Sequence, residues 1–167
     1  MGVTTEYLKE QLEQAFGPAI YQYAEPHGFP TMEIDPAKIR EVLAWLKDHA
    51  ELQMNFLTDI TGIHYPDHKG KEIGVIYHVH GWVHNIRLRI KCFMPAEDPA
   101  IDSVTPVHAG ANWMERETYD LFGVIFREHP NLRRILNVDE MDYFPMRKEY
   151  PLEDATRTDK EDKYFGR

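Results

Sequence analysis

IRLRIKC, residues 86–92, is the clearest indication of the fold. Every second side chain in it is apolar, and each residue between them is Arg or Lys. The apolar positions are Ile86, Leu88, Ile90 and Cys92, and the basic positions are Arg87, Arg89 and Lys91. Because successive side chains of a strand point to opposite faces, this alternation predicts a strand with one buried face and one exposed face. Such half-buried strands are typical of antiparallel sheets.

The residues before this stretch predict the rest of the sheet. Strands are expected at residues 56–65 and 73–80, and the strand that contains the stretch is expected to span residues 83–94. Gly81-Trp82 is the predicted tip of the hairpin between the last two strands, because glycine permits the positive φ that tight turns require. A shorter strand is expected at residues 20–23.

Two helices are predicted ahead of these strands. Residues 5–16 have apolar side chains at helical spacing, and Gly17-Pro18 ends that helix. Asp35 is placed to cap a second helix in which Pro36 takes the first position, and this helix is expected to end near His49. Helices on one face of an antiparallel sheet form an α+β domain, which is the predicted fold class.

Size and charge limit the possible functions. The chain has 167 residues, enough for one domain with a substantial core and a short extension. Its net charge of -9 argues against a nucleic-acid partner, since phosphate binding needs a basic surface. Cys92 is the single cysteine, which excludes an internal disulfide and an all-cysteine zinc or iron–sulfur site. No run approaches the ~20 apolar residues of a membrane span, and no signal peptide is visible, so we expect a cytoplasmic location.

The histidines do not predict a metal site. His78 and His80 share one face of a strand, but His84 lies beyond the predicted turn and no third ligand is specified. These histidines are therefore expected to be exposed or hydrogen-bonded. His64 and His68 lie in a turn-rich segment and are expected to face solvent.

A third helix is predicted at residues 111–122, and its charges allow three interpretations. Glu115 and Glu117 are two residues apart, so their carboxylates point about 200° apart on a helix, which opposes a paired acid and base. Arg116 and Asp120 are i,i+4 neighbours able to form a surface ion pair on a solvated face. The third interpretation is a helix whose charges are matched by a partner protein.

Residues 115–152 contain a long and chemically mixed motif. ERETYDLFG at residues 115–123 is followed by HPNLRRIL at 129–136 and PMRKEYPL at 145–152. This combination resembles the 30-kDa-type (C) subunit of the proton-pumping NADH:quinone oxidoreductase, respiratory complex I. The family patterns are E-R-E-x-x-D-hydrophobic-hydrophobic-G, H-P-x-L-x-R-I-L and P-L-R-K-D-F-P-L. Residues 140–145 have the length of the family's G-F-x-G-H-P segment but neither its glycines nor its histidine.

The resemblance implies a scaffold subunit with no cofactor and no independent activity of its own. FMN, iron–sulfur clusters and quinone are then expected in other subunits of the complex. It also implies contact with the 49-kDa-type (D) subunit, with the cluster-bearing B and I subunits nearby, in a hetero-oligomer on the cytoplasmic face of the bacterial inner membrane. The residues expected at the partner interface are Trp113, Glu115, Arg116, Glu117, Asp120, His129, Arg133, Arg134, Tyr143, Phe144, Arg147 and Lys148.

Three regions are predicted along the chain. They are an α+β core domain at residues 1–110, a signature helix and loop at 111–136, and an extended C-terminal arm at 137–167. The chain is expected to be irregular from Gly123 onward. Prolines limit regular structure in the arm, which has apolar groups but little means of burying them internally. We therefore expect the arm to be mobile in the free chain and ordered in the complex.

Two alternatives share the motif. They are the corresponding subunit of a membrane-bound group 4 hydrogenase and the J subunit of the photosynthetic ferredoxin-dependent complex. A binding module outside bioenergetics or a small hydrolase is the alternative from a different class. Turnover by the purified chain alone would favour the hydrolase.

Overall fold

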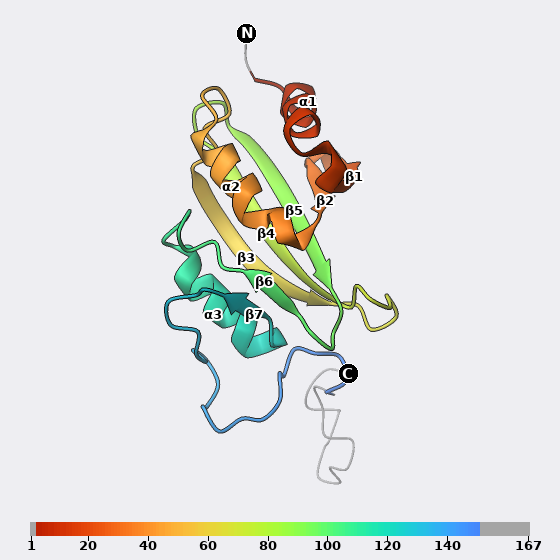
Figure 1. Ribbon diagram of the computed structural model, residues 1–167, viewed down its shortest axis with the longest axis vertical. Coiled ribbons are helices and arrows are strands. Elements are labelled where there is room, and N and C mark those ends of the chain that lie inside the picture. The colour runs from red at the N-terminus through yellow and green to blue at the C-terminus, as the bar shows by residue number, and fades with distance from the viewer. Residues whose placement is uncertain (1–2, 151–167) are drawn as a thin grey trace, which may run out of the picture.

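The computed structural model describes residues 3–150 and contains a five-stranded sheet with α-helices packed against it (Figure 1). The strand order is β1-β2-β5-β4-β3. The strands are β1 (Ile20–Ala24), β2 (Thr31–Ile34), β3 (Phe56–His64), β4 (Ile73–Gly81) and β5 (Ile86–Met94). The helices are α1 (Thr5–Phe16), α2 (Ile39–Asp48) and α3 (Ala111–Phe122), with the short 3-10 helices η1 (Gly17–Ala19), η2 (Pro26–Gly28) and η3 (Pro36–Lys38). This is the predicted α+β class.

β4 lies between β3 and β5 in the sheet. It runs antiparallel to β3 on one side and to β5 on the other, so Tyr77 lies opposite both Ile60 and Ile90. All three side chains are buried. The alternation predicted for β5 is confirmed, because its apolar side chains are buried while Arg87 is exposed. One face of the sheet therefore forms the core.

α2 packs its apolar stripe on this core face. The Asp35 carboxylate accepts a hydrogen bond of 3.0 Å from the Ala37 backbone N–H, and Pro36 opens the first turn, which is 3-10 rather than α. The predicted cap is confirmed. The buried residues of α2 are Ile39, Val42, Leu43 and Leu46. None of the helices within residues 3–150 is long and apolar enough to cross a membrane.

α3 rests against the same face at β3, where a glycine makes room for it. A Cβ atom at Gly62 would lie 2.3 Å from the Phe122 ring. Gly62 pairs with Val75 of β4, and Val75 is part of the buried face. The helices therefore cover one side of the sheet, and the opposite side, called the open face below, carries polar and aromatic side chains that no helix of the described region covers.

The hairpin between β4 and β5 differs from the prediction. Gly81 is the last residue of β4, and the turn occupies residues 82–85, so β5 begins at Ile86 rather than at Val83. Asn85, with a φ of 52°, supplies the left-handed conformation. Glycine is needed at position 81 for a steric reason, because a Cβ there would lie 2.8 Å from the Leu52 carbonyl oxygen.

The structure also contains strands that were not predicted from the sequence, namely β2, β6 and β7. β2 runs parallel to β5 and joins β1 to the sheet, whereas the other strand pairs of the sheet are antiparallel. β7 (Ile125–Arg127) pairs in parallel with β6 (Ala100–Asp102), so the expectation of an irregular chain from Gly123 onward is wrong at these residues. Residues 128–150 contain neither helix nor strand, as predicted.

We predict that Gly62→Ala lowers the free energy of unfolding by about 1–3 kcal/mol, because the added methyl group forces the Phe122 ring and α3 away from β3. Urea unfolding followed by circular dichroism measures this change. Gly17→Ala is the matched control, since a Cβ at Gly17 meets no atom within 4 Å. Equal stability of the Gly62→Ala variant and the wild type would contradict the close packing of α3 on β3.

Candidate docking surface

α3 carries the signature residues 115–123 and buries most of its charge. Glu115, Arg116 and Asp120 are each at most 6% exposed. Trp113 and Glu117 face outward. A solvated face is therefore the wrong interpretation for the three buried groups. Their polar atoms are matched within this chain.

Asp120 is the most heavily bonded of these groups. Its Oδ2 atom accepts hydrogen bonds from three consecutive backbone N–H groups, at Ile135 (3.0 Å), Leu136 (2.7 Å) and Asn137 (2.9 Å). Its Oδ1 atom accepts from the Arg134 guanidinium at 2.7 Å and from the Asn137 side-chain amide at 3.0 Å. The chain after β7 therefore curves around one carboxylate. The pair that the helical spacing suggested, Arg116 with Asp120, is replaced by the pair Arg134 with Asp120.

These bonds determine the charge of Asp120. Burial by itself would raise the pKa of the carboxyl group. The hydrogen bonds from Asn137, Arg134 and Leu136 outweigh burial and hold the pKa well below its usual range. Asp120 is therefore an anion at every pH at which the protein is expected to work.

Arg134 joins α3 to the arm, whose described part is residues 137–150. Besides Asp120, its guanidinium donates to the carbonyl oxygens of Met141 at 2.7 Å and Tyr143 at 2.9 Å. It also lies over the Phe144 ring at 5.1 Å. Its side chain is almost fully buried. Arg134 was expected at the partner interface, but its donors are engaged inside the chain.

Arg116 secures the segment just before the arm. Its guanidinium donates to the carbonyl oxygens of Arg133 at 3.2 Å and Arg134 at 3.1 Å. The same group lies 4.9 Å from the Trp113 ring centroid. Arg116 therefore links the exposed Trp113 ring to the backbone that leads into the arm.

Gly123 and Phe144 fix the next contact of the arm. Gly123 ends α3 in the left-handed conformation with a φ of 76°, and a Cβ there would lie 2.5 Å from the Phe144 ring. Arg147 also packs on this contact, with its guanidinium 5.0 Å from the Phe144 ring, and donates to the Phe122 carbonyl oxygen at 2.7 Å. Glycine is required at position 123 both for its conformation and for the approach of the ring.

The far end of the described arm is tied to the sheet. The Lys148 backbone N–H donates to His64 Nδ1 at 2.9 Å. His64 is buried, so the expectation that it faces solvent is wrong. The contacts of residues 137–150 show an arm anchored on its own domain, in contrast to the expected lack of internal partners. The rest of the predicted arm, residues 151–167, lies outside the described residues.

Glu115 fixes the loop between β6 and α3. Its carboxylate accepts hydrogen bonds of 2.7 Å from the Ser103 hydroxyl and 2.7 Å from the Val104 backbone N–H. Arg40 of α2 donates to the Ser103 carbonyl oxygen at 2.8 Å. Burial raises the pKa of Glu115 to about 7, although both hydrogen bonds to the carboxylate act in the opposite direction.

His129 lies beside Glu115 without forming an ion pair at neutral pH. Its Nε2 is 3.1 Å from the Asn112 carbonyl oxygen, and its Nδ1 accepts from the Asn131 backbone N–H at 3.0 Å. A ring that donates through one nitrogen and accepts through the other is neutral. Burial, together with the nearby Arg116 charge, also lowers the pKa of His129. His129 therefore positions the loop that begins the second half of the motif.

The predicted interface residues fall into two groups. Those with buried or bonded side chains are Glu115, Arg116, Asp120, His129, Arg134, Phe144 and Arg147. Those that face outward are Trp113, Glu117, Arg133, Tyr143 and Lys148. The first group binds the signature loop and the arm to the rest of the domain. The second group is exposed on α3, on the loop and on the arm.

Sequence reasoning missed several residues of this surface. Leu136 and Val138 are 65% and 63% exposed, close to the 62% of Trp113. Met146 and Tyr150 are also exposed. We refer to these exposed residues and the outward-facing residues above collectively as the arm surface. Asn137, which binds both Asp120 oxygens, was missed as well, because nothing in its local sequence marks a contact with a helix that ends at Phe122.

The histidines and the cysteine serve structural purposes. His78 accepts a hydrogen bond from Arg89 at 2.9 Å, and His80 lies 3.0 Å from the Asn85 side-chain oxygen. Cys92 is fully buried, and burial raises the pKa of its thiol. Residues 3–150 contain no group of three His, Cys, Asp or Glu side chains placed to hold a metal ion.

We predict that Asp120→Asn lowers the free energy of unfolding at pH 7 by about 3 kcal/mol, because it removes an anion from a buried pair. The wild-type contribution is fully present above the ordinary Asp pKa of about 4 and is lost only as the pH falls toward the lower pKa of the folded state. The difference between the two proteins therefore shrinks in acid. Urea unfolding from pH 7 down to pH 3 measures it, with the exposed Asp142→Asn as control. A difference that does not change with pH would contradict a charged Asp120.

Glu115 gives the opposite pH dependence. Because its folded-state pKa is raised from 4.5 to about 7, wild-type stability should fall as the pH rises between these values. Glu115→Gln retains the shape of the protonated group and should be more stable than the wild type at pH 8 by about 2–3 kcal/mol. Glu117→Gln, on the exposed side of α3, is the control and should change little. A loss of stability in Glu115→Gln at pH 8 would show that the ionised form is needed.

Comparisons with known protein sequences identify the family. The model for "Respiratory-chain NADH dehydrogenase, 30 Kd subunit" matches residues 32–156. The second NADH-quinone oxidoreductase C subunit of Rhizobium etli is 37% identical over 153 residues, which are 91% of this chain and 80% of that protein. The NADH-quinone oxidoreductase C subunit of a Nocardioides species is 45% identical over 107 residues. The aligned part is 64% of this chain and 43% of the Nocardioides protein, so the chain spans less than half of that relative.

Solved structures agree with these matches. A trypsin-resistant fragment (1–134) of Nqo5 superposes with a TM-score of 0.63 at 31% identity, covering 75% of this chain and 98% of the fragment. A chain of the membrane-bound sulfane sulfur reductase, an archaeal respiratory membrane complex, has a TM-score of 0.72 over 88% of this chain and 85% of that one. Its identity of 22% shows a shared fold alone. The family match covers most of the signature helix, loop and arm described above, and the chain belongs to the family of the 30-kDa subunit of the respiratory-chain NADH dehydrogenase.

Proposed function

We propose that this chain is the 30-kDa-type (C) subunit of a proton-translocating NADH:quinone oxidoreductase and acts there as a scaffold. The observation that carries the proposal is the match to the second C subunit of Rhizobium etli, 37% identical over 91% of this chain. The chain supplies shape and docking contacts, and the redox chemistry takes place in other subunits. FMN, iron–sulfur clusters and quinone are assigned to those subunits.

The arm surface is the proposed site of docking. It presents the large apolar side chains of Trp113, Leu136 and Val138 on a backbone that buried charges hold in place. Exposed aromatic and aliphatic side chains on an ordered frame are typical of the central contacts of protein interfaces. The neighbouring Glu117 and Arg133 supply charges that a partner can match at the rim.

The proposed partner at this surface is the 49-kDa-type (D) subunit, with the B and I subunits close by. Within such an assembly the chain is a peripheral subunit on the cytoplasmic face of the bacterial inner membrane. The division into a core domain (1–110), a signature helix and loop (111–136) and an arm (137–167) belongs to the same proposal. β6 of the first region pairs with β7 of the second, so a strand pair joins these two regions.

The corresponding subunits of a group 4 hydrogenase and of the photosynthetic ferredoxin-dependent complex remain the alternatives. Purification of the tagged chain from native membranes distinguishes them, because the co-purifying subunits differ at the electron-input end. An NADH-oxidising module among these subunits supports the proposal. Hydrogenase subunits or a ferredoxin-binding module in its place would overturn it.

We predict that Leu136→Glu lowers NADH:quinone activity in membranes by tenfold or more, since a buried and unpaired charge at an interface costs about 2–5 kcal/mol. The isolated variant should unfold at the same urea concentration as the wild type, because Leu136 makes its hydrogen bond through the backbone and its side chain is 65% exposed. Activity in membranes and retention of the 49-kDa-type subunit on the tagged chain are the two measurements.

Tyr21→Glu is the matched control for this experiment. Tyr21 is 57% exposed but lies on β1, at the edge of the sheet opposite to β3. Its substitution should leave both activity and retention of the 49-kDa-type subunit unchanged. Equal losses of activity and of the 49-kDa-type subunit in Leu136→Glu and Tyr21→Glu, or no loss in either variant, would contradict the proposal that the arm surface is the docking site.

A further inference from the structure

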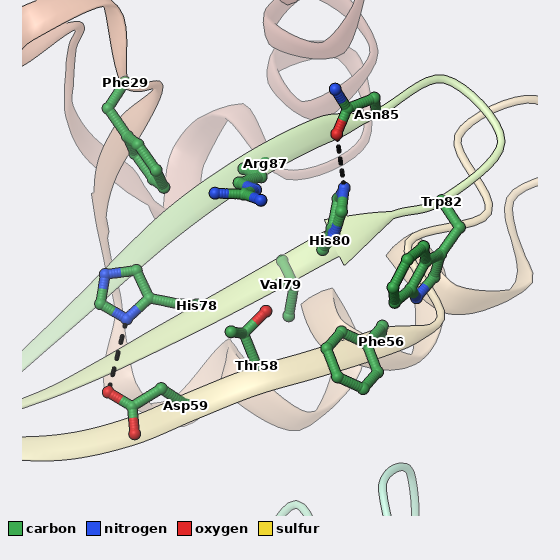
Figure 2. Close-up of a pocket in the computed structure, with 10 residues that line it drawn as sticks. All are labelled: Phe29, Phe56, Thr58, Asp59, His78, Val79, His80, Trp82, Asn85 and Arg87. Carbon is green, nitrogen blue, oxygen red and sulfur yellow. Dashed lines mark hydrogen bonds and ion pairs between the residues drawn. The ribbon is translucent and has the colours of Figure 1, made fainter.

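A hollow of about 620 Å³ lies on the open face of the sheet, on the side away from the helices (Figure 2). It is formed by β3, β4, the turn at residues 82–85 and the start of β5. Its lining residues include Phe56, His78, His80, Trp82 and Arg87. None of these residues belongs to the arm surface, and the function proposed above does not use them.

One end of the hollow is apolar and exposed. The rings of Phe56 and Trp82 lie 5.4 Å apart, and the His80 ring lies 5.0 Å from Trp82. Trp82 is 64% exposed and Phe56 is 43% exposed. Aromatic side chains grouped in this way offer a large contact area at little cost in side-chain entropy, which is why they are enriched in the buried centres of protein interfaces.

The polar side chains of the hollow are held in fixed orientations. His80 Nε2 lies 3.0 Å from the Asn85 side-chain oxygen, which fixes the ring next to Trp82. At the other end, the Arg89 guanidinium donates to His78 at 2.9 Å and lies 4.8 Å from the Phe29 ring. Figure 2 shows His78 and His80 of β4 next to Asp59 and Phe56 of the neighbouring strand β3. A ligand therefore meets an ordered site.

The charge of the hollow differs from that of the whole chain. The chain has a net charge of -9. Among the lining residues Arg87 is the one Lys or Arg and Asp59 is the one carboxylate, and Arg89 lies next to the hollow on His78. Asp59 lies 3.7 Å from His78, and no carboxylate within residues 3–150 lies within ion-pair distance of Arg87. An exposed guanidinium in the same hollow as two exposed rings is suited to a segment that carries a carboxylate close to an apolar side chain.

We propose that this hollow docks a segment of a partner protein in which an acidic side chain lies next to an aliphatic or aromatic side chain. The carboxylate pairs with Arg87, and the apolar side chain covers Trp82 and Phe56. The inference rests on the proposed function in one respect, because the partner is taken to be a fellow subunit of the assembly. α3, which carries the exposed Trp113 of the arm surface, packs on the core face of the sheet, whereas the hollow lies on the open face. The two sites are therefore available to different neighbours.

A photoreactive benzoylphenylalanine in place of Trp82 tests the proposal in the intact assembly. We expect a crosslink to one segment of another subunit, with Asp or Glu within the crosslinked peptide. Arg87→Glu should lower the yield of this crosslink by about tenfold or more, because it places two carboxylates together. Arg87→Lys should retain most of the yield. Lys9→Glu, an equal charge reversal on α1, is the control and should leave the yield unchanged.

The other occupants of the hollow are outcomes that overturn the proposal. These are a crosslink to a second copy of this chain, a crosslink to lipid, or a yield that does not respond to Arg87→Glu. Benzoylphenylalanine at Leu136 reports separately on the arm surface. A crosslink to a fellow subunit from Leu136 and none from Trp82 overturns this inference alone, whereas the absence of a crosslink from Leu136 counts against the proposed function.

Discussion

One buried anion, the Asp120 carboxylate, determines the course of the chain after β7. Moving a carboxylate out of water costs several kcal/mol unless hydrogen bonds satisfy its oxygens. Here a guanidinium, a side-chain amide and three consecutive backbone N–H groups surround it. Consecutive amides converge on one oxygen only where the backbone curves around it. The bonds that offset the desolvation cost therefore also define the turn that begins the arm.

The signature motif combines two tasks in one stretch of sequence. Its buried members, such as Arg116 and Arg134, bind carbonyl oxygens of the following segment and hold it against α3. Its exposed members, such as Leu136 and Met146, face outward from these segments. This explains the close mixing of charged and apolar residues, because the charges satisfy the polar backbone of a segment that has neither helix nor strand to do so.

Sequence reasoning succeeded where the decisive contacts are local. Alternation predicted the buried face of β5, and Asp35 with Pro36 predicted the start of the second helix. Sequence reasoning failed where the contact joins distant residues.

Helical spacing paired Arg116 with Asp120, but the partner of Asp120 is Arg134, 14 positions further along the chain. Gly81 has the local sequence of a turn residue, although the constraint on it comes from the Leu52 carbonyl oxygen of another segment. The exposure of Leu136 likewise depends on how the backbone is turned at Asp120, which no local pattern reveals.

The described part of the arm, residues 137–150, is bonded near both of its ends, to α3 through Asp120 and to β3 through the hydrogen bond from Lys148 to His64. These two contacts hold residues 137–148 as a loop against their own domain. Fixing the backbone of one residue costs about 1–2 kcal/mol in conformational entropy, and a loop that is already ordered does not add this cost to association. Assembly then resembles the docking of two rigid bodies. A weakening of either fastening would show itself first in the rate and tightness of assembly, before any loss of the fold.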